Sequence, residues 1–203
     1  MTKDSLLNQL TATALESVMM QKGYAFFKNG DYNLNIIGIR GDYGRKVTNK
    51  FDDFMVVLYN KNGELQKKVY SITTDPGKYY MQKPSNGKGT AILVPNQYRG
   101  CWQIGKHNGK YTALVQCKPV SVFRDENKDG YYDYKNVDTG LFGINIHRSN
   151  PYTSSSNIDN WSAGCQVFAS VKEFNEFMGL CEEQRKRYGN SFTYTLIDEK
   201  DLG

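Results

Sequence analysis

One cysteine and one histidine of this chain are placed so that they could form a nucleophile and its base. Cys165 follows the small residues Ser162, Ala163 and Gly164, and His147 lies upstream of them. A thiol attacks as its thiolate, so it needs a base or a positive environment. Glycine lets a substrate carbonyl approach the backbone, whose amides can stabilise an oxyanion. The pattern fits cysteine-based acyl transfer, and it also fits a buried structural thiol near a loop histidine.

The segments on either side predict how these two residues are held. Apolar residues over 141–147 predict a strand that ends at His147, where a rigid scaffold gives way to a polar loop. The spacing of the apolar residues becomes helical over 170–189, and we expect Ser170 to cap this helix and Gly189 to end it. The start of that helix would bring its positive field near Cys165.

The rest of the chain predicts one mainly β domain. Apolar residues at helical spacing predict a first helix, capped by Asp4 or Ser5 and ended by Gly23. We expect a helical segment over 1–30 and a catalytic domain over 31–203. Besides 141–147, strands are expected from residue type and turn signals at 32–41, 53–60, 64–74, 90–95, 101–106, 110–116, 120–124 and 191–198.

Composition narrows the class of protein. The 15 tyrosines and 10 phenylalanines favour a strand-rich globular chain over a disordered one. The net charge of +5 suits a slightly basic protein, and no basic stripe accompanies the tyrosines, so we expect no nucleic-acid partner. The first 23 residues contain neither a secretory signal nor a membrane span, which predicts synthesis in a cytoplasm.

The segment from His147 to Cys165 resembles the signature of the L,D-transpeptidase catalytic domain. That signature is a strand ending in histidine, a loop of a dozen or more residues, and then Ser/Thr-x-Gly-Cys. Residues 72–81 are similar to the family's Thr-Pro-Thr-Gly-aromatic strand, with Asp75-Pro76-Gly77 in its place. The parts follow in the family's order, and the resemblance covers roughly residues 33–198.

The resemblance implies an L,D-transpeptidase-like β-barrel or sandwich that acts on peptidoglycan stem peptides and requires no cofactor. Cys165 would attack a peptide carbonyl to form a thioester, and His147 would take the thiol proton and return it to the leaving amine. The backbone carbonyl of Arg148 would orient the imidazole. The amides of Gly164 and Cys165 would form part of the oxyanion hole, and Ser162 would brace the loop beside the substrate.

Departures from the family pattern concern substrate binding. Arg148 stands where the family has glycine, Ala163 where it often has a polar residue, and Val167 where an arginine or asparagine holds substrate. Arg148 or Arg99 could supply the missing positive charge. Trp161, next to the motif, could be a substrate platform or could pack the loop.

Two readings of the function remain open from the sequence. The first is an active L,D-transpeptidase or L,D-peptidase, the outcome depending on whether an amine or water resolves the thioester. The second is a retired enzyme that serves as a binding or structural module, for example in a phage virion. Action at the bacterial cell wall would need phage-type release or virion delivery.

A second pattern suggests calcium. Asp125, Asn127, Asp129, Gly130 and Asp133 fall at positions 1, 3, 5, 6 and 9 of an EF-hand-type loop, which surrounds calcium with hard oxygen ligands. Position 12 is asparagine instead of glutamate, and the flanks are expected to be strands. The alternatives are a degenerate calcium loop and a solvated acidic turn.

The remaining histidine and cysteines are expected to play no part in catalysis. His107 falls in a predicted hairpin turn and is expected at the surface. Cys101, Cys117 and Cys181 show no metal-ligand spacing and are expected to be packed, free thiols.

Overall fold

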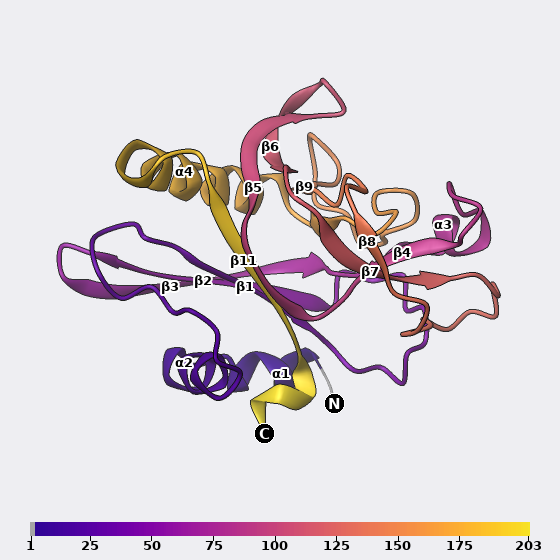
Figure 1. Ribbon diagram of the computed structural model, residues 1–203, viewed down its shortest axis with the longest axis horizontal. Coiled ribbons are helices and arrows are strands. Elements are labelled where there is room, and N and C mark those ends of the chain that lie inside the picture. Colours follow the sequence, from indigo (N-terminus) through magenta and orange to yellow (C-terminus); the bar gives the residue numbers. More distant parts are fainter. Residues whose placement is uncertain (1–2) are drawn as a thin grey trace.

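The computed structural model describes residues 3–203, in which eight strands close into a barrel and three form a second sheet (Figure 1). The barrel order is β1-β11-β5-β6-β9-β10-β3-β2, and the second sheet is β4-β7-β8. The chain is mainly β, as the sequence predicts. The strands are β1 (Asn35–Arg40), β2 (Asp53–Lys61), β3 (Glu64–Thr73), β4 (Thr90–Leu93), β5 (Asn96–His107), β6 (Tyr111–Gln116), β7 (Val120–Asp125), β8 (Asp138–Gly140), β9 (Ile146–Arg148), β10 (Gln166–Phe168) and β11 (Phe192–Asp198).

The predicted hairpin between the second and third strands is confirmed. β2 and β3 pair antiparallel, with Lys61 opposite Glu64. Asn62 and Gly63 form the turn with positive φ angles of 53° and 80°. Two successive residues of positive φ give a turn whose twist matches that of the flanking strands, and asparagine followed by glycine adopts it at the lowest cost.

The barrel interior is filled by aromatic and aliphatic side chains. Trp102, Tyr194 and Phe168 are completely buried, and their rings belong to one cluster that spans the barrel. The helix α4 (Val171–Tyr188) covers one side of this core through Phe174 and Phe177, whose rings pack against Phe168. Its predicted ends are confirmed, because the Ser170 side chain caps the start and Gly189 follows the last turn.

The first predicted helix is two helices instead of one. α1 (Lys3–Gln9) and α2 (Ala12–Gln21) are separated because the Thr11 hydroxyl accepts the Ala14 amide at 3.1 Å and so caps a new helix. Asp4 and Ser5 lie inside α1, so neither is its cap. Both helices cover the side of β1 and β2 opposite α4 (Figure 1). Residues 1–2 of the expected segment 1–30 lie outside the described residues.

The strand predicted over 141–147 is largely wrong. Only the end of this segment forms a strand, β9. Gly143 turns the chain with φ 72°, and the Gln116 side chain accepts hydrogen bonds from the amides of Phe142 and Ile144 at 3.1 and 2.9 Å. These amides would otherwise bond to a neighbouring strand. The sequence reading also missed short elements: β8, β10, the helix α3 (Lys78–Gln82) and the 3-10 helix η1 (Glu199–Leu202).

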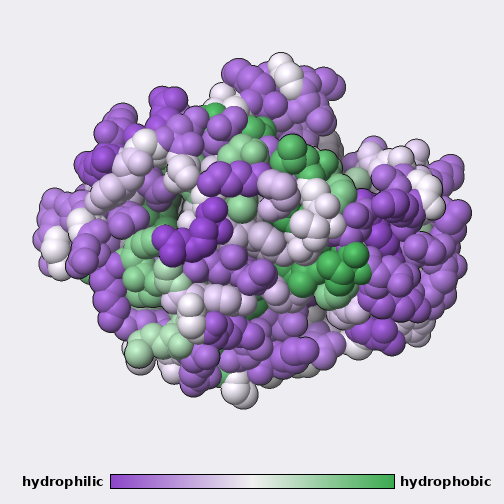
Figure 2. Space-filling view, viewed as in Figure 1, coloured by the Kyte–Doolittle hydropathy of each residue, from purple (hydrophilic) through white to green (hydrophobic). Residues whose placement is uncertain are grey.

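The surface shows several separate hydrophobic patches on a mostly hydrophilic face (Figure 2). No helix within residues 3–203 is long and apolar enough to cross a membrane.

Candidate active site

The short parallel strands β9 and β10 bring the candidate pair together. Val167 pairs with His147, and the amide of Gln166 donates to the carbonyl of Asn145 at 2.9 Å. Cys165 lies directly before β10, and Asn145 lies directly before β9. The two residues are therefore neighbours at the same end of the strand pair. Residues far apart in sequence thus meet at one end of a rigid parallel pair.

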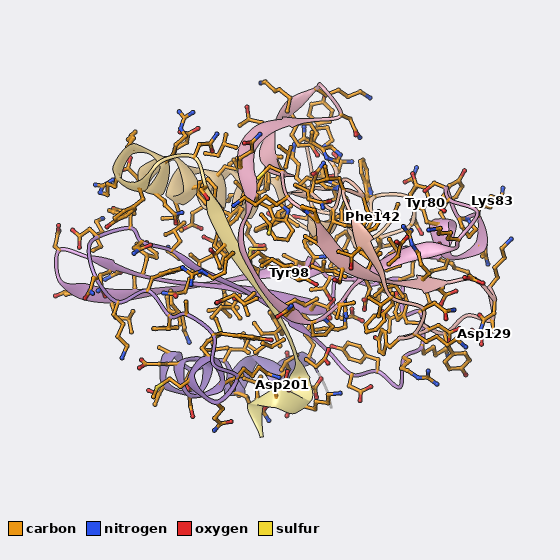
Figure 3. All side chains as sticks on the ribbon, in the orientation of Figure 1. Tyr80, Lys83, Tyr98, Asp129, Phe142 and Asp201 are labelled. Carbon is orange, nitrogen blue, oxygen red and sulfur yellow. The ribbon has the colours of Figure 1, made fainter. Side chains whose placement is uncertain are left out.

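Two clefts meet at Cys165. The larger has a volume of about 670 Å³, and the smaller has a volume of about 300 Å³. Figure 3 labels one residue of each, Tyr80 of the larger and Phe142 of the smaller. The residues common to both linings are Gly143, Ala163 and Cys165.

The thiol of Cys165 is half-buried and neutral at rest. Its Sγ donates to the carbonyl of Gly143 at 3.3 Å and accepts the amide of Asn145 at 3.4 Å. Burial raises the pKa of the thiol to about 11, and the Asn145 amide opposes part of that rise. At neutral pH the thiol is therefore protonated, and a reaction at this sulfur would need a base.

His147 is held as a neutral imidazole. Its Nδ1 lies 2.8 Å from the carbonyl of Arg148, which can only accept, so Nδ1 carries the hydrogen and Nε2 keeps its lone pair. Tyr111 donates to the same carbonyl at 3.2 Å. Burial, and then the neighbouring His107, lower the pKa of His147 to about 3. The imidazole is therefore unprotonated at neutral pH, and the same lowering of its pKa makes it a weak base until a substrate changes its surroundings.

Alkylation of Cys165 by iodoacetamide is expected to rise about tenfold per pH unit between about pH 7 and pH 10, because the thiolate is the reactive form. With a pKa of about 11, roughly one thiol in 10⁴ is ionised at pH 7. Mass spectrometry of the Cys165 peptide measures the rate, with glutathione as a control that should level off near its own pKa of about 8.5. A plateau for Cys165 by pH 8 would instead indicate a thiolate–imidazolium pair at rest.

Ser162 braces the loop that presents the thiol. It is completely buried, its hydroxyl donates to the carbonyl of Cys165 at 2.8 Å, and it accepts the amide of Gly164 at 3.2 Å. The Gly164 amide is therefore engaged within the loop. Of the two amides expected in an oxyanion hole, that of Cys165 is the stronger candidate.

Replacing Gly164 by alanine is expected to destabilise the fold by about 1–3 kcal/mol. Gly164 has φ 119°, and an added Cβ would lie 2.4 Å from the Ala91 carbonyl oxygen. Gly179→Ala, in the middle of α4, is the matched control, because the new Cβ would meet nothing within 4 Å apart from the helix's own backbone and adjacent residues. It should stabilise by about 0.5–1 kcal/mol. Urea unfolding measures both, and a Gly164→Ala protein as stable as the parent would contradict the strained loop.

A buried polar network supports the same loop from behind. Thr74 donates to Asp53 through both its amide and its hydroxyl, and it accepts from Arg40, which also pairs with Asp75 at 2.9 Å. Gln166 donates to the carbonyls of Thr74 and Gly164, both at 3.3 Å. Burial raises the pKa of Asp75 to about 7, against the lowering by Arg40.

Burial explains the departure at Val167, whose side chain packs in an apolar cluster with Phe51, Ile158 and Ala169. Val167 and Gln166 are both completely buried, and Gln166 also accepts from the Tyr194 hydroxyl at 2.8 Å. Neither side chain lines a cleft, so no substrate-binding group can come from this position. Sequence reasoning missed the part played by Arg40 and Gln166, because nothing in the spacing links them.

Of the substrate-binding candidates Arg148, Arg99 and Trp161, the structure places two at the site. Arg148 and Trp161 line the larger cleft. The Arg148 guanidinium lies over the Tyr111 ring at 4.0 Å, and Trp161 also packs against a small buried cluster below the loop. Arg99 lines neither cleft: it lies over the Phe27 ring at 5.7 Å, away from Cys165.

His107 lies in the site, contrary to the expectation of a surface residue. It is the last residue of β5, so the turn begins after it, and it pairs with Tyr111 across the hairpin. Its ring stacks on His147 with centroids 4.0 Å apart, and its Nδ1 lies 3.0 Å from the Asn145 side-chain amide. Burial and then Arg148 lower its pKa. Placing His107 from the sequence would have needed the exact pairing of residues across the β5–β6 hairpin.

The predicted calcium residues begin at Asp125, the last residue of β7, and continue into the connection to β8, and none of them lines either cleft. Asp129 is at the end of the molecule opposite α4 (Figure 3). The Asn127 amide donates to Asp129 at 3.2 Å and to Asp133 at 2.9 Å, and Asp125 accepts the Asp133 amide at 3.0 Å. Within the described chain, no group of three or more His, Cys, Asp or Glu is arranged to hold a metal ion. Calcium binding here stays a prediction.

The other three cysteines are free thiols, of which Cys101 and Cys181 are buried and Cys117 is half-buried. None lines either cleft. In comparisons with known proteins, no family model matches the chain, and no curated protein is significantly similar to it. The geometry around Cys165 and His147 is therefore the ground on which a function is argued.

Proposed function

We propose that the chain is a cysteine acyl-transfer enzyme of the L,D-transpeptidase type that acts on peptidoglycan stem peptides. The observation that carries the proposal is a thiol at the junction of two clefts, beside a buried histidine whose Nδ1 is fixed on the Arg148 carbonyl. A neutral imidazole with a free Nε2 suits a general base, and a neutral thiol needs one.

The first half of the reaction forms a thioester. Sγ of Cys165 attacks the peptide carbonyl while Nε2 of His147 takes the thiol proton. The carbonyl oxygen becomes an oxyanion, which the Cys165 amide can stabilise. The intermediate then collapses, the carbon–nitrogen bond breaks, and the imidazolium of His147 gives its proton to the leaving amine.

The second half releases the acyl group. An amine or water attacks the thioester, and His147 removes a proton from it and returns that proton to the departing sulfur of Cys165. Two clefts that meet at the thiol can hold two peptides, one acylating the enzyme and one accepting the acyl group. This arrangement favours transpeptidation over hydrolysis.

The lining of the larger cleft supports a stem-peptide substrate. Lys110 and Arg148 contribute positive charge, and no aspartate or glutamate lines the cleft within the described residues. Stem peptides carry free carboxylates, which such a cleft would attract. Tyr80, Tyr111 and Trp161 add aromatic surface for the peptide backbone.

One observation favours the alternative of a retired, non-catalytic module. The thiol of Cys165 has a raised pKa, whereas many cysteine enzymes hold a reactive thiolate at rest. In that case the clefts would bind wall peptides without turnover. Delivery by a phage particle or by lysis is proposed for either reading.

Product analysis separates these readings. Purified chain is incubated with disaccharide-tetrapeptide fragments, and the products are separated and weighed by mass spectrometry. Cross-linked dimers indicate transpeptidation, and shortened stems indicate hydrolysis. Unchanged fragments, together with measurable binding of them, would contradict the enzyme and favour the retired module.

A further inference from the structure

A third cavity, with a volume of about 440 Å³, has a markedly basic lining. Lys46 and Lys50 come from the connection between β1 and β2, Lys78 from α3, and Lys128 from the connection between β7 and β8. No aspartate or glutamate lines this cavity among the described residues. Three segments distant in sequence thus bring four positive charges to one hollow.

One acid contacts the wall of the cavity, because Asp159 accepts a hydrogen bond from the Asn49 side chain at 2.7 Å, but it forms no ion pair with these lysines. Within residues 3–203, none of the four lysines takes part in an ion pair, and Lys50 donates to the neutral amide oxygen of Asn157 at 2.6 Å. Lysines around a concave surface focus a positive potential and repel one another. An anion in the cavity would relieve that repulsion.

Hydrogen bonds to main-chain amides hold the walls of the cavity in place. The Asn49 side chain accepts the amides of Lys78 at 3.0 Å and Asp159 at 2.9 Å, and the amide of Val47 donates to the Gly130 carbonyl at 2.9 Å. The segments that bear the lysines are therefore tied to one another. Binding an anion would need ordering of lysine side chains but no rearrangement of the backbone.

The cavity also has an apolar part. Met81 and Val47 line it, and both belong to the cluster formed with Ile92 and Tyr132. Met81 is 3% exposed and Val47 is half-buried, so Val47 provides most of the apolar surface that an inorganic anion would leave uncovered. A ligand with a short carbon skeleton would cover it, and the cavity volume falls in the range of small-molecule sites.

We propose that this cavity binds a small organic phosphate, with the phosphate on the lysines and the carbon skeleton on Val47 and Met81. A phosphate offers several strong acceptor oxygens and up to two negative charges, and lysine ammonium groups bind it as point charges. A single carboxylate would leave most of the four positive charges unmatched. The inference is independent of the acyl-transfer function.

Calorimetric titration with glycerol phosphate tests the proposal. Lys50→Gln/Lys78→Gln is expected to weaken binding at least about tenfold, because two charge-assisted contacts are lost. The matched control is Lys61→Gln/Lys172→Gln, which removes the same charge from exposed sites outside the cavity and should leave the affinity nearly unchanged. Thermal unfolding of both variants verifies that they are folded.

Three results would overturn the proposal. The first is the absence of any heat of binding at millimolar glycerol phosphate, and the second is an equal loss of affinity in both double variants. The third is inorganic phosphate binding as tightly as glycerol phosphate. The last would show that the apolar part contributes nothing. Unchanged affinity of Cys165→Ala for glycerol phosphate is expected, so failure of the acyl-transfer function and failure of this site give different results.

Discussion

Replacing Cys165 by alanine is expected to abolish product formation from stem peptides. No other group at the junction of the two clefts can form the thioester, because Ala163 and Gly143, which share that junction, carry no nucleophile. Loss of a covalent nucleophile removes the acyl-enzyme route itself. The rate should fall to the detection limit of the product assay.

Cys117→Ala is the matched control for that substitution. Cys117 is also half-buried and free, but it lines neither cleft. Its replacement should leave the turnover rate unchanged. Residual turnover by Cys165→Ala at more than a trace, or an equal loss in both variants, would show that another group carries the reaction.

Replacing His147 by glutamine is expected to lower kcat/KM by roughly 10²–10⁴-fold, the usual contribution of a positioned general base. Glutamine keeps a donor for the Arg148 carbonyl but offers no group that can accept the thiol proton. Since the resting thiol is neutral, the reaction depends on this proton transfer. Initial rates at subsaturating substrate measure the loss.

The pH profile distinguishes a base from a structural residue. With pKa values of about 3 for His147 and about 11 for Cys165, the imidazole stays unprotonated and the thiol stays protonated across the neutral range. The parent's kcat/KM is therefore expected to be flat from about pH 5 to about pH 9. In His147→Gln it should rise with pH, because the thiolate must form without help.

His107→Gln serves as the control for the second histidine of the site. His107 stacks on His147, but the Arg148 carbonyl that fixes the base would be unaffected by its loss. A much smaller fall in rate is expected than for His147→Gln, with the flat pH profile retained. A pH profile in His147→Gln identical to the parent's would contradict the role of His147 as base.

Much of the fold follows from residue types close together in the chain. The β2–β3 hairpin is predictable because Asn62-Gly63 stabilises one turn, and α4 because Ser170 and Gly189 mark its ends. The break at Thr11 was missed because a threonine can lie within a helix or cap one, and the local sequence does not decide between these. Short strands such as β10 depend on partners distant in sequence.

The site shows the same division. Cys165 and His147 were found because their spacing and flanking residues carry a pattern. His107 was missed because a shift of one or two residues in the hairpin decides whether it lies in the turn or in the strand beside His147. The hydrogen bond from Gln166 to the Thr74 carbonyl depends on the packing of β10 against β3, which no local pattern encodes.

The most direct test of the central claim is to trap the acyl-enzyme. The protein is mixed with disaccharide-tetrapeptide, quenched in acid, and measured by intact-mass spectrometry and peptide mapping. We expect an added mass equal to the acyl part of the substrate, located on Cys165 and removed by hydroxylamine, as a thioester requires. Turnover with no adduct at Cys165, or an adduct on another residue, would contradict it.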